Sequence, residues 1–199
     1  MSIPSLYFFE DIITKDSSDS IINELDNDEI NKWTPIFNNE KARVVKQFGF
    51  KYSYTSYQIN KLAPSMPDYI LELRDILTEK CKELKILKPD YIFNQCIVNN
   101  YESGQGINPH TDFRGFGEII ASFTLGGGAS VKFKNKNKND NIISDEVVIY
   151  TTNMSLYIMS GDARYNWTHE IAGRQSDIVD GEKIKRERRI SVTFRNVPN

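Results

Sequence analysis

The clearest element of the chain is marked by apolar residues at helical spacing. They recur every three or four positions, at Ile70, Leu73, Leu77, Cys81 and Leu84. This period places side chains on one face of an α-helix. The preceding segment, Ser65-Met66-Pro67-Asp68, offers a cap residue, a proline near the first helical position and an acid in the first turn. The pattern predicts a helix that packs against a sheet and carries no chemistry.

Upstream of this helix the chain alternates between short patterns. Leu6 to Phe9 is apolar and aromatic and predicts a strand, and Thr14 to Leu25 predicts a helix. Ala42 to Ile59 is rich in Tyr and Phe, as strands are, and Gly49 within it indicates a turn or bulge. An α/β layer is therefore expected at the N-terminus.

From Tyr91 onward the pattern changes to strands separated by Gly, Asn and Asp. The predicted strands are Tyr91 to Tyr101, Glu118 to Leu125, Ala129 to Lys134, Glu146 to Thr151, Ser155 to Met159 and Arg189 to Val197. The Asn/Lys-rich tract from Asn135 to Asn141 is expected to be an exposed hairpin tip or a partly disordered loop. Several short strands at this spacing favour a sandwich or jelly roll. The fold class is thus α+β, mainly β.

Composition narrows the class of protein. With 199 residues, 39% of them hydrophobic, the chain fits one domain with a buried core. It has no apolar run near the ~20 residues of a membrane span and no signal-peptide pattern. Cys81 and Cys96 lack metal-type spacing, which favours a reducing compartment. We expect an intracellular monomer, cytoplasmic or nuclear.

Net charge is −2, which does not indicate nucleic-acid binding, yet basic residues cluster locally. The two clusters are Lys132, Lys134, Lys136 and Lys138, and then Lys183, Lys185, Arg186, Arg188 and Arg189. Each cluster is either an anion-binding patch or ordinary solvated surface.

The chain has two histidines, and their surroundings suggest a metal site. His110 belongs to His110-Thr111-Asp112, while His169 lies far downstream. Residues two apart on an extended backbone point to the same side, so His110 and Asp112 can bind one metal. Two imidazoles and one carboxylate form the facial triad of non-haem Fe(II) oxygenases. The same ligands also suit a zinc hydrolase.

The segment Arg189 to Arg195 bears on this choice. Its alternation places Arg189, Ser191, Thr193 and Arg195 on one face of a strand. Two guanidiniums on an inward face are costly unless they bind anions, and a dicarboxylate beside the metal supplies such anions. The alternative is an edge strand with solvated arginines.

These elements together resemble the AlkB family of Fe(II)/2-oxoglutarate dioxygenases. The matching segments are Asn99-Asn100-Tyr101-Glu102-Ser103-Gly104, His110-Thr111-Asp112, His169 and Arg189 to Arg195, with Ser191 where the family often has Asn. The resemblance implies a double-stranded β-helix (jelly-roll) core that binds Fe(II), 2-oxoglutarate and O2. It implies Fe(II) on His110, Asp112 and His169, and the cosubstrate on Asn99, Tyr101, Arg189, Ser191 and Arg195.

Other segments resemble the AlkB-like domain of homologues that hydroxylate a modified wobble uridine of tRNA. They are Arg43 to Phe50, Tyr101 to Ile107 and Gly161 to His169. The implied activity is demethylation or hydroxylation of bases in single-stranded DNA or RNA, including tRNA, for DNA repair or RNA modification. A protein or small-molecule substrate is the alternative.

The resemblance also implies a layout for the whole chain, 1–199, as one dioxygenase domain. Residues of about 1–90 would form an N-terminal extension with a substrate-recognition lid, and about 91–199 the catalytic core. Cations and aromatics that suit a phosphate backbone and a flipped base are the candidate substrate-binding residues. They are Arg43, Lys46, Phe48, Phe50, Tyr52, Tyr54 and Arg114.

Overall fold

Two antiparallel sheets dominate the protein, whose computed structural model describes residues 2–36, 42–136 and 145–198. The larger sheet contains, in spatial order, β1 (Leu6–Phe9), β11 (Ser155–Met159), β8 (Ile120–Gly126), β15 (Arg189–Arg195), β6 (Gln95–Tyr101), β3 (Val44–Phe48) and β2 (Thr34–Pro35). The smaller sheet contains β10 (Glu146–Thr151), β9 (Ala129–Asn135), β12 (Trp167–Ile171) and β7 (Ile107–His110). The mainly-β architecture predicted from the sequence is confirmed.

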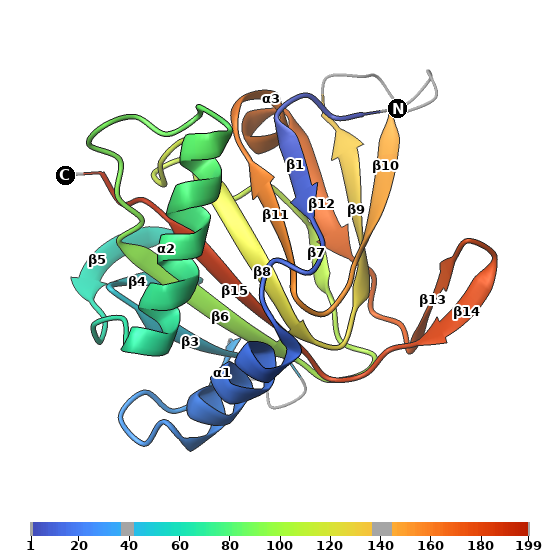
Figure 1. Ribbon diagram of the computed structural model, residues 1–199, viewed down its shortest axis with the longest axis horizontal. Coiled ribbons are helices and arrows are strands. Elements are labelled where there is room, and N and C mark those ends of the chain that lie inside the picture. Colours follow the sequence, from blue (N-terminus) through green and yellow to red (C-terminus); the bar gives the residue numbers. More distant parts are fainter. Residues whose placement is uncertain (1, 37–41, 137–144, 199) are drawn as a thin grey trace.

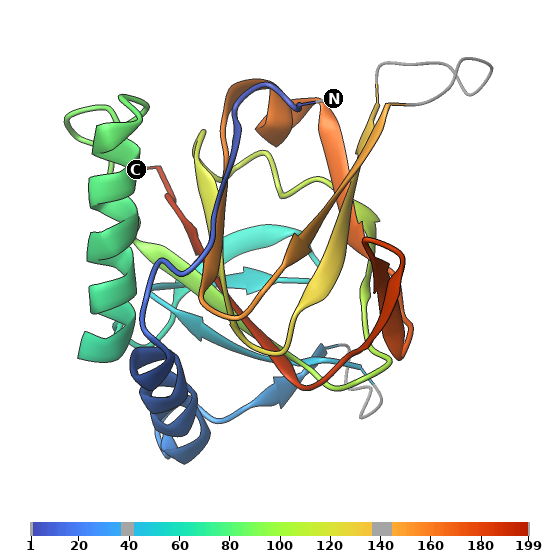
Figure 2. The same ribbon diagram turned by 45° about the vertical axis from the view of Figure 1, so that its right-hand side comes forward.

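The two faces of the larger sheet pack against different partners (Figures 1 and 2). One face meets helices α1 (Lys15–Asn27) and α2 (Asp68–Glu83), and the other meets the smaller sheet. β15 lies between β8 and β6 in the middle, and all of its residues are buried. Its alternation therefore separates an apolar helix-facing side, with Ile190, Val192 and Phe194 in the helix-side core, from a polar side.

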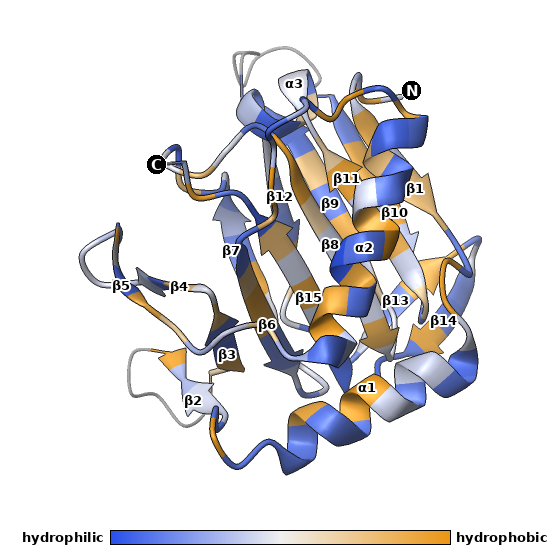
Figure 3. Ribbon diagram, turned by 60° about the vertical axis from the view of Figure 1, so that its left-hand side comes forward, coloured by the Kyte–Doolittle hydropathy of each residue, from blue (hydrophilic) through white to orange (hydrophobic). Residues whose placement is uncertain are grey.

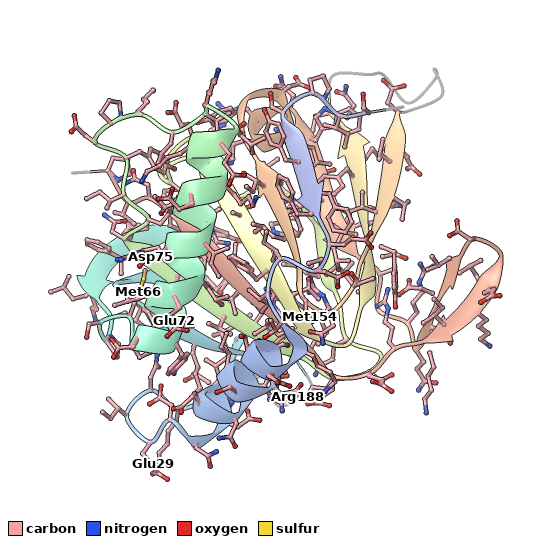
Figure 4. The ribbon with its side chains drawn as sticks, viewed as in Figure 1. Glu29, Met66, Glu72, Asp75, Met154 and Arg188 are labelled. Carbon is pink, nitrogen blue, oxygen red and sulfur yellow. The ribbon has the colours of Figure 1, made fainter. Side chains whose placement is uncertain are left out.

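The helices form where the apolar spacing predicts them. Ile70, Leu73, Leu77 and Cys81 of α2 are buried against the sheet, and Figure 3 shows apolar residues recurring along both helices. Arg188, labelled in Figure 4, lies just before the central strand β15. It pairs with Asp26 of α1 at 2.7 Å, and its Nε donates to Asn100 Oδ1 at 2.9 Å. This contact fixes α1 against the start of β15.

A hairpin projects from the β3 end of the larger sheet (Figure 3). It is formed by β4 (Phe50–Ser53) and β5 (Gln58–Leu62), and Gly49 makes the turn that leads into it. Gly49 has φ +75°, and a Cβ there would lie 2.0 Å from the carbonyl oxygen of Asn94. Only glycine fits this close approach without strain, so the predicted turn at Gly49 sets the direction of the hairpin.

Several short elements are not apparent in the sequence pattern. They are β7, β12, the five-residue helix α3 (Gly161–Tyr165), and the hairpin of β13 (Ser176–Val179) and β14 (Glu182–Lys185). The predicted loop from Asn135 to Asn141 falls largely on residues 137–144, outside the described residues. Within the parts described, no helix is long and apolar enough to cross a membrane.

Candidate metal centre and cosubstrate site

The candidate ligands meet at the edge of the smaller sheet. His110 at the end of β7 lies directly opposite His169 in β12, and their ring centroids are 4.3 Å apart. Asp112 follows β7, and one ligand atom from each of the three residues lies within 4.8 Å of the others. The cross-strand pairing therefore unites ligands that are distant in the sequence.

Hydrogen bonds orient the first two ligands for a metal. His110 Nδ1 lies 2.8 Å from the carbonyl oxygen of Asn108, which leaves Nε2 free to coordinate. Arg195 donates to Oδ1 of Asp112 from Nε at 3.0 Å and from Nη2 at 2.8 Å. The other carboxylate oxygen, Oδ2, lies 3.6 Å from Nε2 of His169. One oxygen of Asp112 is thus held by the protein and the other faces the two imidazoles.

The protonation states suit a metal site as well. Burial, reinforced by the neighbouring His110, lowers the pKa of His169 to about 3, so its imidazole is neutral at pH 7. Burial opposes ionisation of Asp112, but Arg195 and the two histidines hold the pKa of this carboxyl well below its usual range. The neutral imidazole of His169 and the anionic carboxylate of Asp112 are the forms that bind divalent iron.

Arg164 of α3 is a supporting residue that the sequence analysis missed. Its side chain is buried, and it donates to the backbone oxygen of Asp112 at 3.1 Å and to that of Phe113 at 2.8 Å. It therefore fixes the backbone that carries the carboxylate ligand. The available signal was an arginine five residues before the second histidine, but its partners lie about fifty residues away in the chain.

The polar side of β15 forms a second part of the site. Arg189 is 3% exposed, and its Nη2 donates to Thr124 Oγ1 at 2.9 Å. Its Nε is buried without a hydrogen-bond partner in the described protein, and burial lowers the pKa of the guanidinium. A buried cation with an unused donor is costly by itself and fits a carboxylate from a ligand. This observation supports 2-oxoglutarate as the bound anion.

The structure brings the predicted cosubstrate residues together around one narrow cavity of about 50 Å³. Asn99, Tyr101, Arg189, Ser191 and Arg195 all line it, together with the three metal ligands. Thr124 was not predicted, because its contact with Arg189 depends on the pairing of β8 with β15.

A wider cavity of about 400 Å³ lies outside the metal ligands and shares His110, Asp112 and Asn99 with the inner one. We call it the outer cavity. Its aromatic lining is compact: the Tyr52 ring lies 5.3 Å from Tyr54, 5.8 Å from Phe113 and 5.6 Å from Phe116.

Arg43 supplies a cation to the outer cavity. Its Nε donates to Asn99 Oδ1 at 2.9 Å, and its guanidinium lies 5.7 Å from the centre of the Tyr101 ring. Of the predicted substrate-binding residues, Arg43, Tyr52 and Tyr54 line this cavity.

Lys46 and Phe48, which were predicted to bind substrate, do not line the outer cavity. Both are 1% exposed and point to the helix side of the sheet, because they are two residues apart in β3. Lys46 Nζ lies 3.7 Å from Asp28 and 5.0 Å from the Trp33 ring, and Phe48 belongs to the core. A role in substrate contact for these two is therefore corrected to a role in packing. Phe50 and the exposed Arg114 are not among the lining residues.

This fold and site define a non-haem iron oxygenase that uses 2-oxoglutarate. A profile described as the 2OG-Fe(II) oxygenase superfamily matches residues 5–195, and the chain belongs to this superfamily. Iron(II) and 2-oxoglutarate are its cofactors, and it is an oxidoreductase. The zinc hydrolase alternative is not supported.

Within the superfamily the chain is AlkB-like. It is 30% identical over 98% of its length to tRNA (carboxymethyluridine(34)-5-O)-methyltransferase alkbh8 of Xenopus tropicalis, of which the match covers 32%. It is 38% identical to protein L905 of Acanthamoeba polyphaga mimivirus over 72% of this chain and 64% of that protein. The chain thus spans about a third of the alkbh8 protein and less than two thirds of L905.

The jelly-roll fold is confirmed by a solved structure. That of OsALKBH1 superposes with a TM-score of 0.70 and 16% identity, and the match covers 98% of each chain.

Proposed function

We propose that this oxygenase oxidises a base in single-stranded nucleic acid, as an RNA-modifying, tRNA-modifying or repair enzyme. The observation that carries the proposal is the outer cavity, which joins an aromatic lining and the cation of Arg43 to the metal ligands. At about 400 Å³ it falls within the range of small-molecule sites, roughly 300–1,000 Å³. A flipped base needs aromatic surfaces for stacking and polar groups at its edge.

Each side chain then has a distinct task. His110, Asp112 and His169 hold Fe(II), and Arg195 keeps Asp112 ionised and oriented. Arg189, whose Nη2 donates to Thr124, binds the distal carboxylate of 2-oxoglutarate near Asn99, Tyr101 and Ser191. When bound, iron and 2-oxoglutarate supply the oxidant that hydroxylates a substrate C–H bond at the expense of O2. A hydroxylated N-methyl group leaves as formaldehyde, whereas a hydroxyl on another carbon stays.

The outer cavity holds the base next to the metal ligands His110 and Asp112. Tyr52, Phe113 and Phe116 provide the stacking surface, and Arg43 donates to an acceptor on the base or its phosphate. The names of similar proteins support nucleic acid as the substrate class. They are the tRNA methyltransferase above and the "Probable RNA/DNA demethylase ALKBH6" of Danio rerio, 23% identical over 98% of this chain.

A protein or small-molecule substrate is the second candidate, favoured by the net charge of −2. We would measure succinate release with N1-methyladenine and N3-methylcytosine in single-stranded DNA and RNA, with tRNA carrying modified wobble uridines, and with methylated peptides. Stimulation by a nucleic acid is expected. Stimulation by peptides alone would overturn the proposal.

A spectroscopic experiment on the wild type and two variants tests the metal site and the outer cavity separately. Anaerobic addition of Fe(II) and 2-oxoglutarate should produce a weak visible charge-transfer band, and His169→Ala should abolish it. Tyr52→Ala is expected to keep the band but to lose stimulation by the nucleic acid, because Tyr52 lines the outer cavity without touching the metal ligands. Undiminished stimulation in this variant would argue against a base in the outer cavity.

A further inference from the structure

A third cavity lies beside the β4–β5 hairpin. It has a volume of about 530 Å³ and is bounded by β2, β3 and both strands of the hairpin. Its lining includes Gln47, Lys51, Tyr52, Tyr54, Lys61 and Leu62. We call it the hairpin cavity. None of the metal ligands lines it.

The hairpin cavity and the outer cavity share one wall. Tyr52 and Tyr54 border both. Gln47 holds this wall in place through both backbone groups of Tyr52: its Nε2 donates to the carbonyl at 3.1 Å and its Oε1 accepts from the amide at 2.6 Å. The two cavities are therefore adjacent to each other.

Two lysines in the hairpin cavity face each other without an acidic partner. Lys51 and Lys61 are directly opposite in the β4–β5 register, and both are exposed. In the described protein no carboxylate forms an ion pair with either, whereas Lys15, Lys80 and Lys82 each have one. Like charges directly opposite on neighbouring strands are destabilising, so an anion between them would relieve a cost of the fold.

The hairpin also exposes an apolar side chain to each cavity. Leu62 borders the hairpin cavity and is 80% exposed, and Tyr57 borders the outer cavity and is 64% exposed. The lysine pair thus lies next to an apolar surface and to the hydroxyls of Ser53, Thr55 and Ser56. Cations beside hydroxyls and an apolar face match a phosphate joined to a base.

We propose that the hairpin cavity binds a nucleotide adjacent in the strand to the one that enters the outer cavity. The phosphate lies between Lys51 and Lys61. The base of the same nucleotide packs on Leu62 and Tyr54. This inference rests on the proposed nucleic-acid function and adds a second subsite to it. The enzyme therefore recognises a short single strand rather than an isolated nucleoside.

The test compares probe lengths on the full protein, held anaerobically with Fe(II) and 2-oxoglutarate. Fluorescence anisotropy is measured with two labelled probes, a single thymidylate and an oligothymidylate of four nucleotides. The test variant is Lys51→Gln/Lys61→Gln. The control is Lys183→Gln/Lys185→Gln, which removes the same charge from exposed positions on β14. The control lysines are suitable because the neighbouring Arg186 and Arg189 are buried and Arg188 is paired with Asp26.

Wild-type protein and the control should bind the longer probe more tightly than the single nucleotide. In the test variant, the gain in affinity from the longer probe should be at least fivefold smaller. The slope of log affinity against log salt concentration should also become less steep by about 0.7 for each phosphate that the lysines no longer neutralise. A full gain in the test variant, or an equal loss in the control, would overturn the subsite. A wild type that neither binds the probes nor is stimulated by nucleic acid would overturn the proposed function as well.

A stability measurement separates lost binding from misfolding. Lys61→Gln removes one of two opposed charges, so its thermal midpoint without nucleic acid should equal or exceed that of wild type. A lower midpoint would contradict the repulsion on which the phosphate site depends.

Discussion

Replacement of Arg189 by Met tests the cosubstrate site most directly, because two effects with opposite signs are expected. Arg189 is buried, bonded to Thr124 through Nη2, and has an unpartnered Nε. Met fills a similar volume without charge or donors. Binding of 2-oxoglutarate should weaken, whereas the protein without metal and cosubstrate should lose no stability.

The size of both effects follows from the contacts. A guanidinium that forms two charge-assisted hydrogen bonds with a carboxylate gains about 1.5 kcal/mol from each, or about 3 kcal/mol in all, which corresponds to about 100-fold in affinity. Arg189→Lys keeps the charge but not the two-pronged geometry, so a loss of about tenfold is expected. A buried unpaired donor costs roughly 1–3 kcal/mol, and the lost bond to Thr124 offsets about 1 kcal/mol of that. The free energy of unfolding should stay level or rise by about 1 kcal/mol.

The assay is titration of 2-oxoglutarate into the anaerobic Fe(II) protein, followed at the charge-transfer band, with urea unfolding of the metal-free protein alongside. Arg188→Met is the matched control, since Arg188 is adjacent but faces Asp26 and Asn100 at the surface. Its 2-oxoglutarate affinity should not change. An Arg189→Met affinity within twofold of wild type would refute the assignment of Arg189 to the cosubstrate.

Two further predictions concern stability. Asp177 is fully buried and accepts hydrogen bonds from Arg186 and Arg174, which hold the pKa of this carboxyl well below its usual range against the effect of burial. Its contribution is complete above pH about 4 and is lost as pH falls further. Asp177→Asn should therefore lower the free energy of unfolding by about 3 kcal/mol at pH 7 and weaken its decline at acid pH, both measured by urea unfolding. Asp180→Asn, at an exposed position, is the control and should do neither. Gly49→Ala should cost about 2 kcal/mol or more, because its Cβ meets the Asn94 carbonyl, whereas Gly181→Ala at φ +85° in open space should cost about 1 kcal/mol.

Equal losses in Asp177→Asn and Asp180→Asn would show that the buried arginine contacts contribute little. Equal losses in the two alanine variants would show that positive φ, rather than the approach to Asn94, decides the cost at Gly49.

The cosubstrate half of the site was predictable because a central strand obeys a simple rule. β15 has a neighbour on each side, so strict alternation separates Arg189 and Arg195 from Ile190 and Phe194. The HxD spacing predicted two ligands of one metal correctly, although Asp112 lies just beyond the end of β7. What this local rule does not supply is a partner from elsewhere in the chain. Thr124 and Arg164 reach the site only through strand pairing and a five-residue helix.

The substrate-binding residues were less predictable, because the sequence does not show which side chains of the segment from Arg43 to Tyr54 are buried in the core. The four aromatics from Phe48 to Tyr54 share one alternating set of positions, but they belong to two strands, β3 and β4, and the sequence does not reveal which of them face the helices. The structure assigns Lys46 and Phe48 to the helix side and Gln47 to the hairpin cavity. The pairing of Lys51 with Lys61 depends further on a register shift between Lys51 and Tyr52. Such a shift has no signature in the residue pattern.

The same geometry decides which residues can report on the substrate alone. Arg43 lines the outer cavity, yet its Nε donates to Asn99 and its guanidinium lies over Tyr101, whose ring also contacts Arg189. A change at Arg43 therefore disturbs the substrate side and the cosubstrate side together. Lys51 and Lys61 line only the hairpin cavity among the cavities described, and neither borders the inner or the outer cavity. An effect on nucleic-acid binding from these lysines is consequently an effect on the substrate, which is what identification of the substrate requires.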